Sequence, residues 1–187
     1  MDRKINYLDT TLRSEYKRYL SNNAFDILVI GGGVTGAGIC LDAASRGLKT
    51  CLIEMNDFAS GTSSKSTKLI HGGLRYLEQF KFGLVRETGR ERAILRNIAP
   101  HIVKSDKMLL PIIKNGKLSK FSTRAALFVY DYLTNVKGKD RNKMLSKNEV
   151  QSMEPLLIDK DLLGGALYSE YRTDDSRLTI DLLKRSM

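Results

Sequence analysis

Apolar residues form two short runs near the beginning of the chain, and a stretch rich in small residues lies between them. The first run predicts a buried parallel strand over 26–30, because its apolar residues are β-branched or leucine and no breaker interrupts them. The small residues predict a helix from about Val34 to a C-terminal cap at Gly47. The second run predicts a strand over 49–54, so the order of these elements indicates an α/β protein.

Two further helices are predicted from weaker periodicity. A helical lead-in is expected over 1–24, with Asp9 or Thr10 as its N-cap. A helix over 84–98 carries an approximate stripe, which comprises Leu84, Thr88, Glu91, Leu95 and Ile98. We expect this stripe to face the core.

The rest of the chain alternates between short elements and polar loops. Strands are expected at 108–113 and 163–168, loops at 56–73 and 135–143, and helices at 121–134, from Ser146 and from 173 onwards. The helix from Ser146 begins with a capping box, in which Glu149 is the third residue.

The turn between the first strand and the helix contains the spacing GxGxxG. Gly31 permits a tight turn, Gly33 lets the backbone approach a diphosphate, and Gly36 allows the helix to lie close to the strand, whereas Gly32 is additional to the motif. Glu54 follows Gly36 by 18 residues, near the roughly 20-residue spacing at which a carboxylate binds an adenosine ribose. The sequence therefore predicts a dinucleotide site at the N-terminus of the helix.

Length and composition indicate which classes of protein this chain can belong to. The 187 residues, 42% of them hydrophobic, suit one domain or parts of two. No apolar run reaches the roughly 18 residues of a membrane-spanning helix, and the charged N-terminus is unlike a secretory signal, so a cytoplasmic protein is expected. Cys40 and Cys51 are expected to be buried core thiols, and no metal site is predicted, because the only histidines are His71 and His101.

The net charge of +10 is concentrated in one segment of the chain. Residues 114–147 contain nine Lys or Arg against Asp131 and Asp140. Within this segment, the helix at 121–134 is amphipathic, and the residues near one face are Phe121, Ala125, Phe128, Val129 and Tyr132. The pattern favours contact with an anionic membrane surface over nucleic acid, and a simply solvated face is an equal alternative.

Only two strong parallel strands are predicted, whereas a doubly wound sheet usually has about five or more. The last helix also needs a partner surface for Leu178, Leu182 and Leu183. We therefore expect the chain to be part of a larger α/β protein.

The segment after the second predicted strand carries the most specific motif. Residues 62–78 are TSSKSTKLIHGGLRYLE, and they follow the glycine turn GGGVTGAGI. In this order the motifs resemble those of the FAD-dependent glycerol-3-phosphate dehydrogenases, the flavoprotein class and not the soluble NAD enzymes. The resemblance is close over 25–111 and weaker up to 171–178, and members of that family are much longer.

This resemblance implies a Rossmann-like FAD/NAD(P)-binding fold of the amine and hydroxy-acid oxidase type, incomplete here and with part of an inserted substrate domain. The implied domains are an N-terminal helical extension at 1–24, the first part of the FAD-binding domain at 25–105, the start of the substrate domain at 106–170, and a truncated return helix at 171–187.

The resemblance also implies which residues bind FAD. The backbone at Gly31, Gly33 and Gly36 would contact the diphosphate, and Glu54 would contact the adenosine ribose. The residues implied to line the ribityl and isoalloxazine region are Thr62, Ser63, Ser66, Lys68, Leu69, His71 and Gly72. The loop's hydroxyls support FAD independently, because the flavin half of the cofactor needs donors beyond the adenosine.

Three residues are predicted to serve the reaction itself. Arg75 and Tyr76 would bind its phosphate, since a guanidinium beside a phenol suits a phosphate monoester. His71 would either donate to a flavin carbonyl or orient its loop. The resemblance implies oxidation of sn-glycerol 3-phosphate to dihydroxyacetone phosphate, with electrons passed to quinone on the inner face of a membrane. The chain alone is expected to lack turnover, because further cationic substrate contacts of the family lie in later sequence.

Other functions stay open from the sequence. An oxidase that reduces oxygen would share this region, and the basic segment permits an FAD-dependent RNA-modifying protein, although HGGLRYLE argues against it. The chain could also be a binding module only, and a homodimer is left open.

Overall fold

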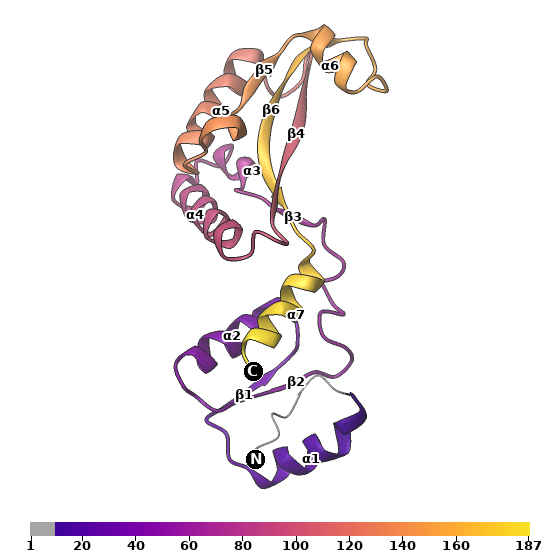
Figure 1. Ribbon diagram of the computed structural model, residues 1–187. Coiled ribbons are helices and arrows are strands. Elements are labelled where there is room, and N and C mark those ends of the chain that lie inside the picture. The colour runs from indigo at the N-terminus through magenta and orange to yellow at the C-terminus, as the bar shows by residue number, and fades with distance from the viewer. Residues whose placement is uncertain (1–9) are drawn as a thin grey trace. The chain divides into compact units, whose positions relative to one another are not determined.

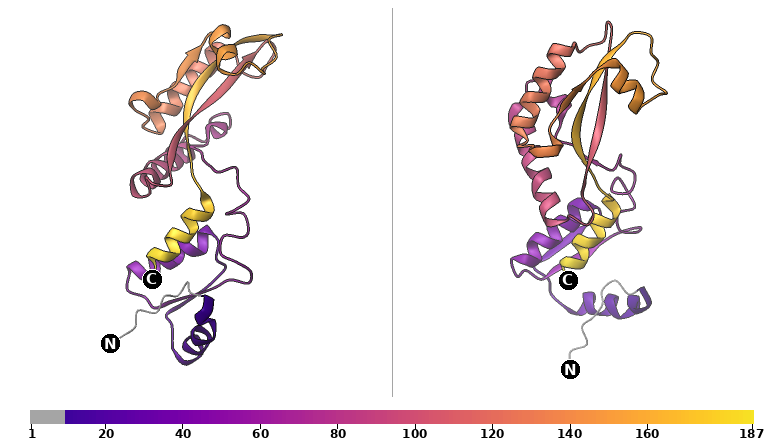
Figure 2. Two further views of the ribbon diagram at one scale, coloured as in Figure 1. Left: turned by 45° about the vertical axis from the view of Figure 1, so that its right-hand side comes forward. Right: turned by 45° about the horizontal axis from the view of Figure 1, so that its top comes forward.

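The computed structural model describes residues 10–187, so the predicted N-cap at Asp9 lies outside the described residues. The chain forms two compact units (Figures 1 and 2). Unit 1 comprises the residues up to Thr67 together with Asp174–Met187, and unit 2 comprises Lys68–Thr173.

Unit 1 contains the predicted strand–helix–strand motif. Strands β1 (Ile27–Ile30) and β2 (Thr50–Ile53) pair in parallel, with Ile27 opposite Thr50, and helix α2 (Val34–Ser45) connects them. Helix α7 (Asp175–Arg185) packs against α2 and buries Leu178 and Leu183, which gives the last predicted helix its partner surface. The predicted α/β core is therefore confirmed.

Two expectations in unit 1 need correction. Only Val29 of β1 is buried, whereas Leu28 and Ile30 are 56% and 79% exposed, because exposure alternates along the strand and only one of its sides is covered within residues 10–187. The lead-in forms a 3-10 turn η1 (Thr10–Leu12) and then α1 (Arg13–Asn22). Its N-cap is Leu12, without a capping side chain, and not Thr10.

Unit 2 is an antiparallel sheet with helices beside it (Figure 1). The long strand β6 (Leu162–Arg172) pairs with β4 (Lys104–Ile113), and also with the short strands β3 (Leu69–Ile70) and β5 (Lys143–Leu145). The helices are α3 (Leu74–Leu77), α4 (Phe82–Ile98), α5 (Lys120–Leu133) and α6 (Lys147–Met153), and a 3-10 turn η2 spans Gly138–Asp140. None of the helices within residues 10–187 is both long and apolar enough to cross a bilayer.

The two units divide the chain at other positions than the predicted domains do. The sequence places 68–105 with the FAD domain, but in the structure this segment packs in unit 2, where α3 and α4 contact α5 and β3 pairs with β6. Strand β3 lies inside the loop expected at 56–73, and β5 begins at the last residue of the loop expected at 135–143, because the partner strand of both, β6, is distant in sequence. Helix α3 lies at 74–77, where no element was predicted.

The buried face of α4 differs from the predicted stripe. Val85, Gly89 and Arg92 are buried, whereas Leu84 and Ile98 are 37% and 67% exposed. Gly89 lies close to α5, since a Cβ there would come within 2.6 Å of the Thr134 side chain. Because the buried face of α4 includes an arginine, a search for apolar periodicity does not detect it.

The capping box of α6 is confirmed. Ser146 Oγ accepts from the Glu149 N–H, and the Glu149 carboxylate accepts from the Ser146 N–H at 2.8 Å. Hydrogen bonds to its carboxylate lower the pKa of Glu149 from 4.5 to about 2; the bond from the Ser146 N–H has the largest effect, and the bond from the Lys143 side chain comes second.

We expect this carboxylate to make α6 sensitive to acid. Because its pKa is lowered on folding, its contribution is complete above pH 4.5 and is lost as the pH falls towards 2. An NMR titration of the side-chain carboxyl should give the low value, and Glu149→Gln should remove the acid-dependent opening of the Ser146 amide. Titration of Glu149 near its ordinary pKa would contradict this expectation.

Candidate functional site

The glycine turn of unit 1 is built for close approach. Gly31 has a φ of +111°, which a residue with a side chain rarely adopts. A Cβ on Gly36 would lie 1.9 Å from the Gly31 carbonyl oxygen, so α2 can begin directly beside β1 only with glycine there. These positions give a physical reason for the first and third glycines of the predicted motif.

Gly32, which seemed additional to the motif, is equally constrained. A Cβ there would lie 2.5 Å from Cδ1 of Phe58 and 3.1 Å from Cβ of Glu54. Its N–H donates to Glu54 Oε2 at 2.7 Å. The sequence gives no signal for this role, because the Phe58 ring is brought to the turn only by the folded loop.

Glu54 lies beside the glycine turn, as a ribose ligand at the end of the second strand should. Its Oε1 accepts from the Asn56 N–H at 2.8 Å, and its Oε2 accepts from Gly32. These backbone donors, Asn56 first and Gly32 second, lower the pKa of Glu54 below its ordinary value. The carboxylate is therefore held ionised and oriented at the turn.

The hydroxyl-rich loop is hydrogen-bonded to helices α2 and α7 of unit 1. Ser63 is buried, and its Oγ accepts from the Val34 N–H at 3.0 Å, in the first turn of α2. Two residues at the start of α7 contact the loop: Ser176 donates to the Ser63 carbonyl, and Asp175 forms a hydrogen bond with Ser66. Thr62 and Ser66 are exposed. The structure thus brings Ser63 to the glycine turn, where it completes the helix N-terminus.

The remaining predicted flavin residues lie in unit 2. Lys68 has a left-handed φ of +63° and accepts from the Thr173 N–H through its carbonyl. Leu69 pairs with Arg172 in β3, His71 is exposed, and Gly72 is buried with its N–H donating to Glu170. Contacts to flavin at these positions stay predictions.

The predicted substrate residues share the short helix α3. Arg75 is exposed, whereas Tyr76 is partly buried and packs against a cluster of Leu77, Val85 and Tyr130. Gly73 precedes them with a φ of +76°, and a Cβ there would lie 2.4 Å from the Tyr76 ring. Arg75 is therefore the side chain of the pair that is open to a ligand, and Tyr76 also packs in the core.

Sequence reasoning missed a buried polar cluster behind this loop. Arg92 of α4, Tyr130 of α5 and Glu170 of β6 are 2%, 0% and 3% exposed, and they bond to one another. The only signal in the sequence is that Arg92 follows Val85 and Gly89 at helical spacing.

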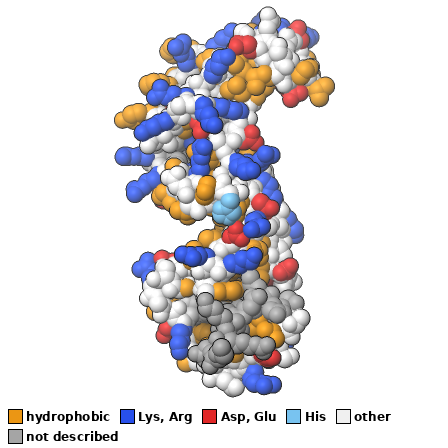
Figure 3. Space-filling view, in the orientation of Figure 1, with side chains coloured by type: hydrophobic (Ala, Val, Ile, Leu, Met, Phe, Trp, Pro, Cys, Tyr) orange, Lys and Arg blue, Asp and Glu red, His pale blue; other side chains and the backbone are white. Residues whose placement is uncertain are grey.

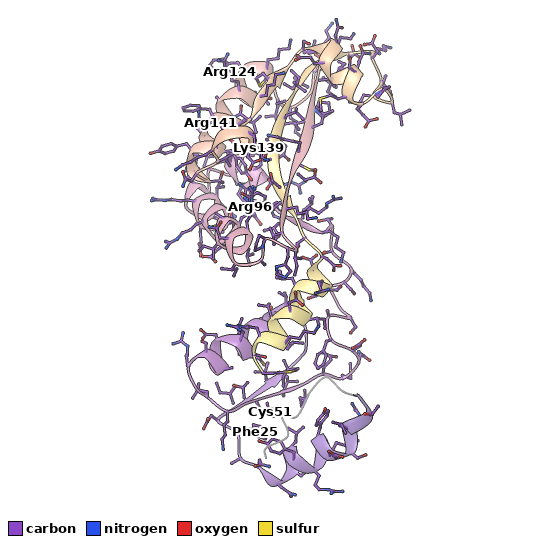
Figure 4. The ribbon with its side chains drawn as sticks, viewed as in Figure 1. Phe25, Cys51, Arg96, Arg124, Lys139 and Arg141 are labelled. Carbon is purple, nitrogen blue, oxygen red and sulfur yellow. The ribbon has the colours of Figure 1, made fainter. Side chains whose placement is uncertain are left out.

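The two cysteines are core residues, as expected. Cys40 of α2 is 4% exposed, and Cys51 of β2, which is labelled in Figure 4, is 8% exposed. Burial raises the pKa of both thiols, which makes them poor nucleophiles.

Several curated proteins are similar to this chain in sequence. An aerobic glycerol-3-phosphate dehydrogenase of Staphylococcus aureus is 55% identical over 179 residues, which are 96% of this chain and 32% of that protein. The chain thus spans about a third of the length of the curated relatives it matches.

Solved structures show the same fold. The glycerol-3-phosphate dehydrogenase from Bacillus halodurans, complexed with FAD, matches with a TM-score of 0.68 and 42% identity, over 94% of this chain and 27% of that one. An L-α-glycerophosphate oxidase from Mycoplasma pneumoniae with FAD bound matches with a TM-score of 0.63 over 88% of this chain and 42% of that one, and at 19% identity it shows the fold alone.

The family described as FAD dependent oxidoreductase matches residues 26–186. This match includes the glycine turn, Glu54 and the hydroxyl-rich loop, and it confirms the predicted Rossmann-like fold class. The chain belongs to the FAD dependent oxidoreductase family.

Proposed function

We propose that this chain binds FAD and that the protein to which it corresponds oxidises sn-glycerol 3-phosphate to dihydroxyacetone phosphate. The observation that carries the proposal is the Glu54 carboxylate held at the glycine turn by the Gly32 N–H. It stands where a dinucleotide's ribose would meet its diphosphate. The 55% identical relative named an aerobic glycerol-3-phosphate dehydrogenase supports the substrate.

The residues present fit this cofactor. In the first turn of a helix the N–H groups have no partner inside the helix. In α2 the Val34 N–H is taken by Ser63, so Thr35 and Gly36 offer theirs to a diphosphate, aided by the helix dipole. Gly36 also leaves no Cβ between the helix and Gly31. When bound, FAD would supply the acceptor for the two electrons and the hydrogen removed from C2 of the substrate.

The chain's own part in the reaction is binding and orientation. The exposed Arg75 guanidinium would hold the substrate phosphate through paired charge-assisted hydrogen bonds. Tyr76, partly buried, would add a hydroxyl contact, and His71 would donate to the cofactor or hold its loop.

A chimera tests the proposal. The aligned residues of the Staphylococcus aureus relative would be replaced by those of this chain, and the purified protein should be yellow and lose its oxidised-flavin spectrum when glycerol 3-phosphate is added without oxygen. Arg75→Met should raise the KM by about 10- to 100-fold, the value of a lost charge-assisted contact. A colourless chimera would refute FAD binding, and an unchanged KM would refute the role of Arg75.

Quinone is proposed as the acceptor, with oxygen as the alternative. Reoxidation of the reduced chimera by a soluble quinone should be much faster than by air. Faster reoxidation by oxygen would make the protein an oxidase.

A salt-sensitive shift of RNA by the chain would instead favour the RNA-modifying alternative. Light scattering during size exclusion would distinguish a homodimer from a monomer.

We also propose that the protein lies in the cytoplasm, peripheral on the inner face of the membrane, and that helix α5 contacts the anionic lipid. The predicted face is solvent-exposed at Phe121, Phe128 and Tyr132, which are 84%, 72% and 80% exposed. Figure 3 shows Lys and Arg side chains interleaved with apolar ones over this part of unit 2, and Arg124 and Arg141 are labelled there in Figure 4. Aromatic residues beside cations suit a lipid interface.

Vesicle binding tests this contact. Changing Phe121, Phe128 and Tyr132 to Ser should weaken co-sedimentation with vesicles containing phosphatidylglycerol by tenfold or more, and salt should weaken the unaltered chain similarly. Leu156→Ser with Ile158→Ser is the matched control, because these residues are 91% and 80% exposed elsewhere in unit 2. Equal loss in both variants, or no binding by the unaltered chain, would refute the contact.

A further inference from the structure

The buried carboxylate of Glu170 lies next to the loop formed by His71, Gly72 and Gly73 in unit 2, and it accepts hydrogen bonds from three donors. Glu170 Oε2 accepts from Arg92 at 2.6 Å and from the Gly72 N–H at 3.0 Å, and Glu170 Oε1 accepts from the Tyr130 hydroxyl at 2.6 Å. Arg92 also donates to the Tyr130 oxygen at 3.1 Å. We call Arg92, Tyr130 and Glu170 the Glu170 cluster.

The backbone of Gly72 is contacted by the Glu170 cluster and by Thr88. The Gly72 N–H donates to Glu170 of β6. The Gly72 carbonyl is one of the acceptors within reach of the Thr88 hydroxyl of α4, at 3.0 Å, beside the Leu84 carbonyl at 2.9 Å. A Cβ at Gly72 would lie 2.3 Å from the Tyr130 oxygen, so the backbone rests directly on the cluster. The position of the loop is therefore set by α4, α5 and β6 together.

The charge of the cluster is unexpected if its only role is stability. A buried ion pair gains little over well-packed apolar residues, because both charges must leave water. Here the guanidinium stacks at 4.8 Å over the Tyr171 ring, and its Nε has no hydrogen-bond partner within residues 10–187. Burial also raises the pKa of Tyr130, so its hydroxyl stays protonated and remains a donor. The cluster is thus a fixed acceptor for one backbone N–H.

We propose that Glu170 is a positioning residue, which through the Gly72 N–H sets where His71 and the helix carrying Arg75 meet the cofactor and the substrate. This inference rests on the proposed function, which places FAD and glycerol 3-phosphate at His71, Gly72 and Arg75. Arg92 and Tyr130 hold the carboxylate in place, and Thr88 contacts the carbonyl of the same residue, Gly72.

Amide exchange of the full chain tests the positioning without any cofactor. In Glu170→Gln the Gly72 N–H loses its charged acceptor, since it then faces either an NH2 group or a neutral amide oxygen, and hydrogen bonds to charged groups are about twice as strong as neutral ones. Exchange of the Gly72 amide should accelerate about tenfold or more, while the β4–β6 ladder amides stay unchanged. Ser169→Ala is the matched control, because its buried hydroxyl has no hydrogen-bond partner among the described residues.

Flavin readouts in the chimera test the consequence for the site. Glu170→Gln should weaken FAD binding about tenfold and alter the visible flavin spectrum, whereas Ser169→Ala should change neither. If Glu170→Gln does not fold, Thr88→Val releases the Gly72 carbonyl and should give the same changes in smaller size. Unchanged Gly72 exchange, or unchanged flavin properties despite faster exchange, would overturn the inference. A chimera without FAD before any substitution would overturn the proposed function instead.

Discussion

Replacing Gly36 by alanine should destroy the turn of unit 1. The new Cβ would sit 1.9 Å from the Gly31 carbonyl oxygen, and backbone on both sides leaves no flexible side chain to move away. Overpacking of this kind costs about 3 kcal/mol or more, which exceeds the usual range for added methylenes because the obstacle is backbone. We therefore expect unit 1 to unfold more easily and FAD binding to be lost.

Gly38 offers a matched control on the same helix. No atom lies within 4 Å of a Cβ at that position, so Gly38→Ala adds a methyl group to open space. Alanine favours a helix over glycine by about 1 kcal/mol, so this variant should be stabilised slightly. The opposite signs are measured by amide exchange of α2, because a single unfolding midpoint is not well defined for a chain that forms two compact units. Equal behaviour of the two variants would show that close packing does not constrain the turn.

The strand–helix–strand unit could be predicted from sequence because its signals are local. The glycines, the small residues of α2 and Glu54 lie within 24 residues, and each has a physical role that requires its residue type. The capping box of α6 was found for the same reason. The sequence could not show that Gly32 is held between Glu54 and Phe58, since no spacing rule describes that contact.

Unit 2 was less predictable because its contacts connect distant residues. Strand β4 begins at Lys104 and not near Met108, since the polar residues Lys104 and Ser105 pair with Arg172 and Tyr171 of β6. An arginine in a helix is usually solvated, and Arg92 is buried only because Glu170 meets it from 78 residues away. The helix position alone gives no such information.

Removal of Arg92 should have a similarly large effect on unit 2. In Arg92→Leu the Glu170 carboxylate, 3% exposed, keeps the Tyr130 and Gly72 donors but loses its countercharge. An uncompensated buried charge costs about 3–5 kcal/mol. Urea unfolding followed by unit 2 amides should show this loss. Arg96→Leu is the control, because that guanidinium pairs with Asp140 near the surface and is 36% exposed, so its loss should cost about 1 kcal/mol.

A double variant separates charge from packing in the same measurement. Arg92→Leu with Glu170→Gln removes both charges, so the Arg92→Leu penalty should shrink once the carboxylate has gone. The two changes should therefore be less costly together than the sum of the single variants, by about 2 kcal/mol, since contacting residues couple by about 0.5–3 kcal/mol. Strict additivity, or an Arg92→Leu penalty no larger than that of Arg96→Leu, would mean that the carboxylate is not held by Arg92. The Glu170 carboxylate would then owe its position to the Tyr130 and Gly72 donors.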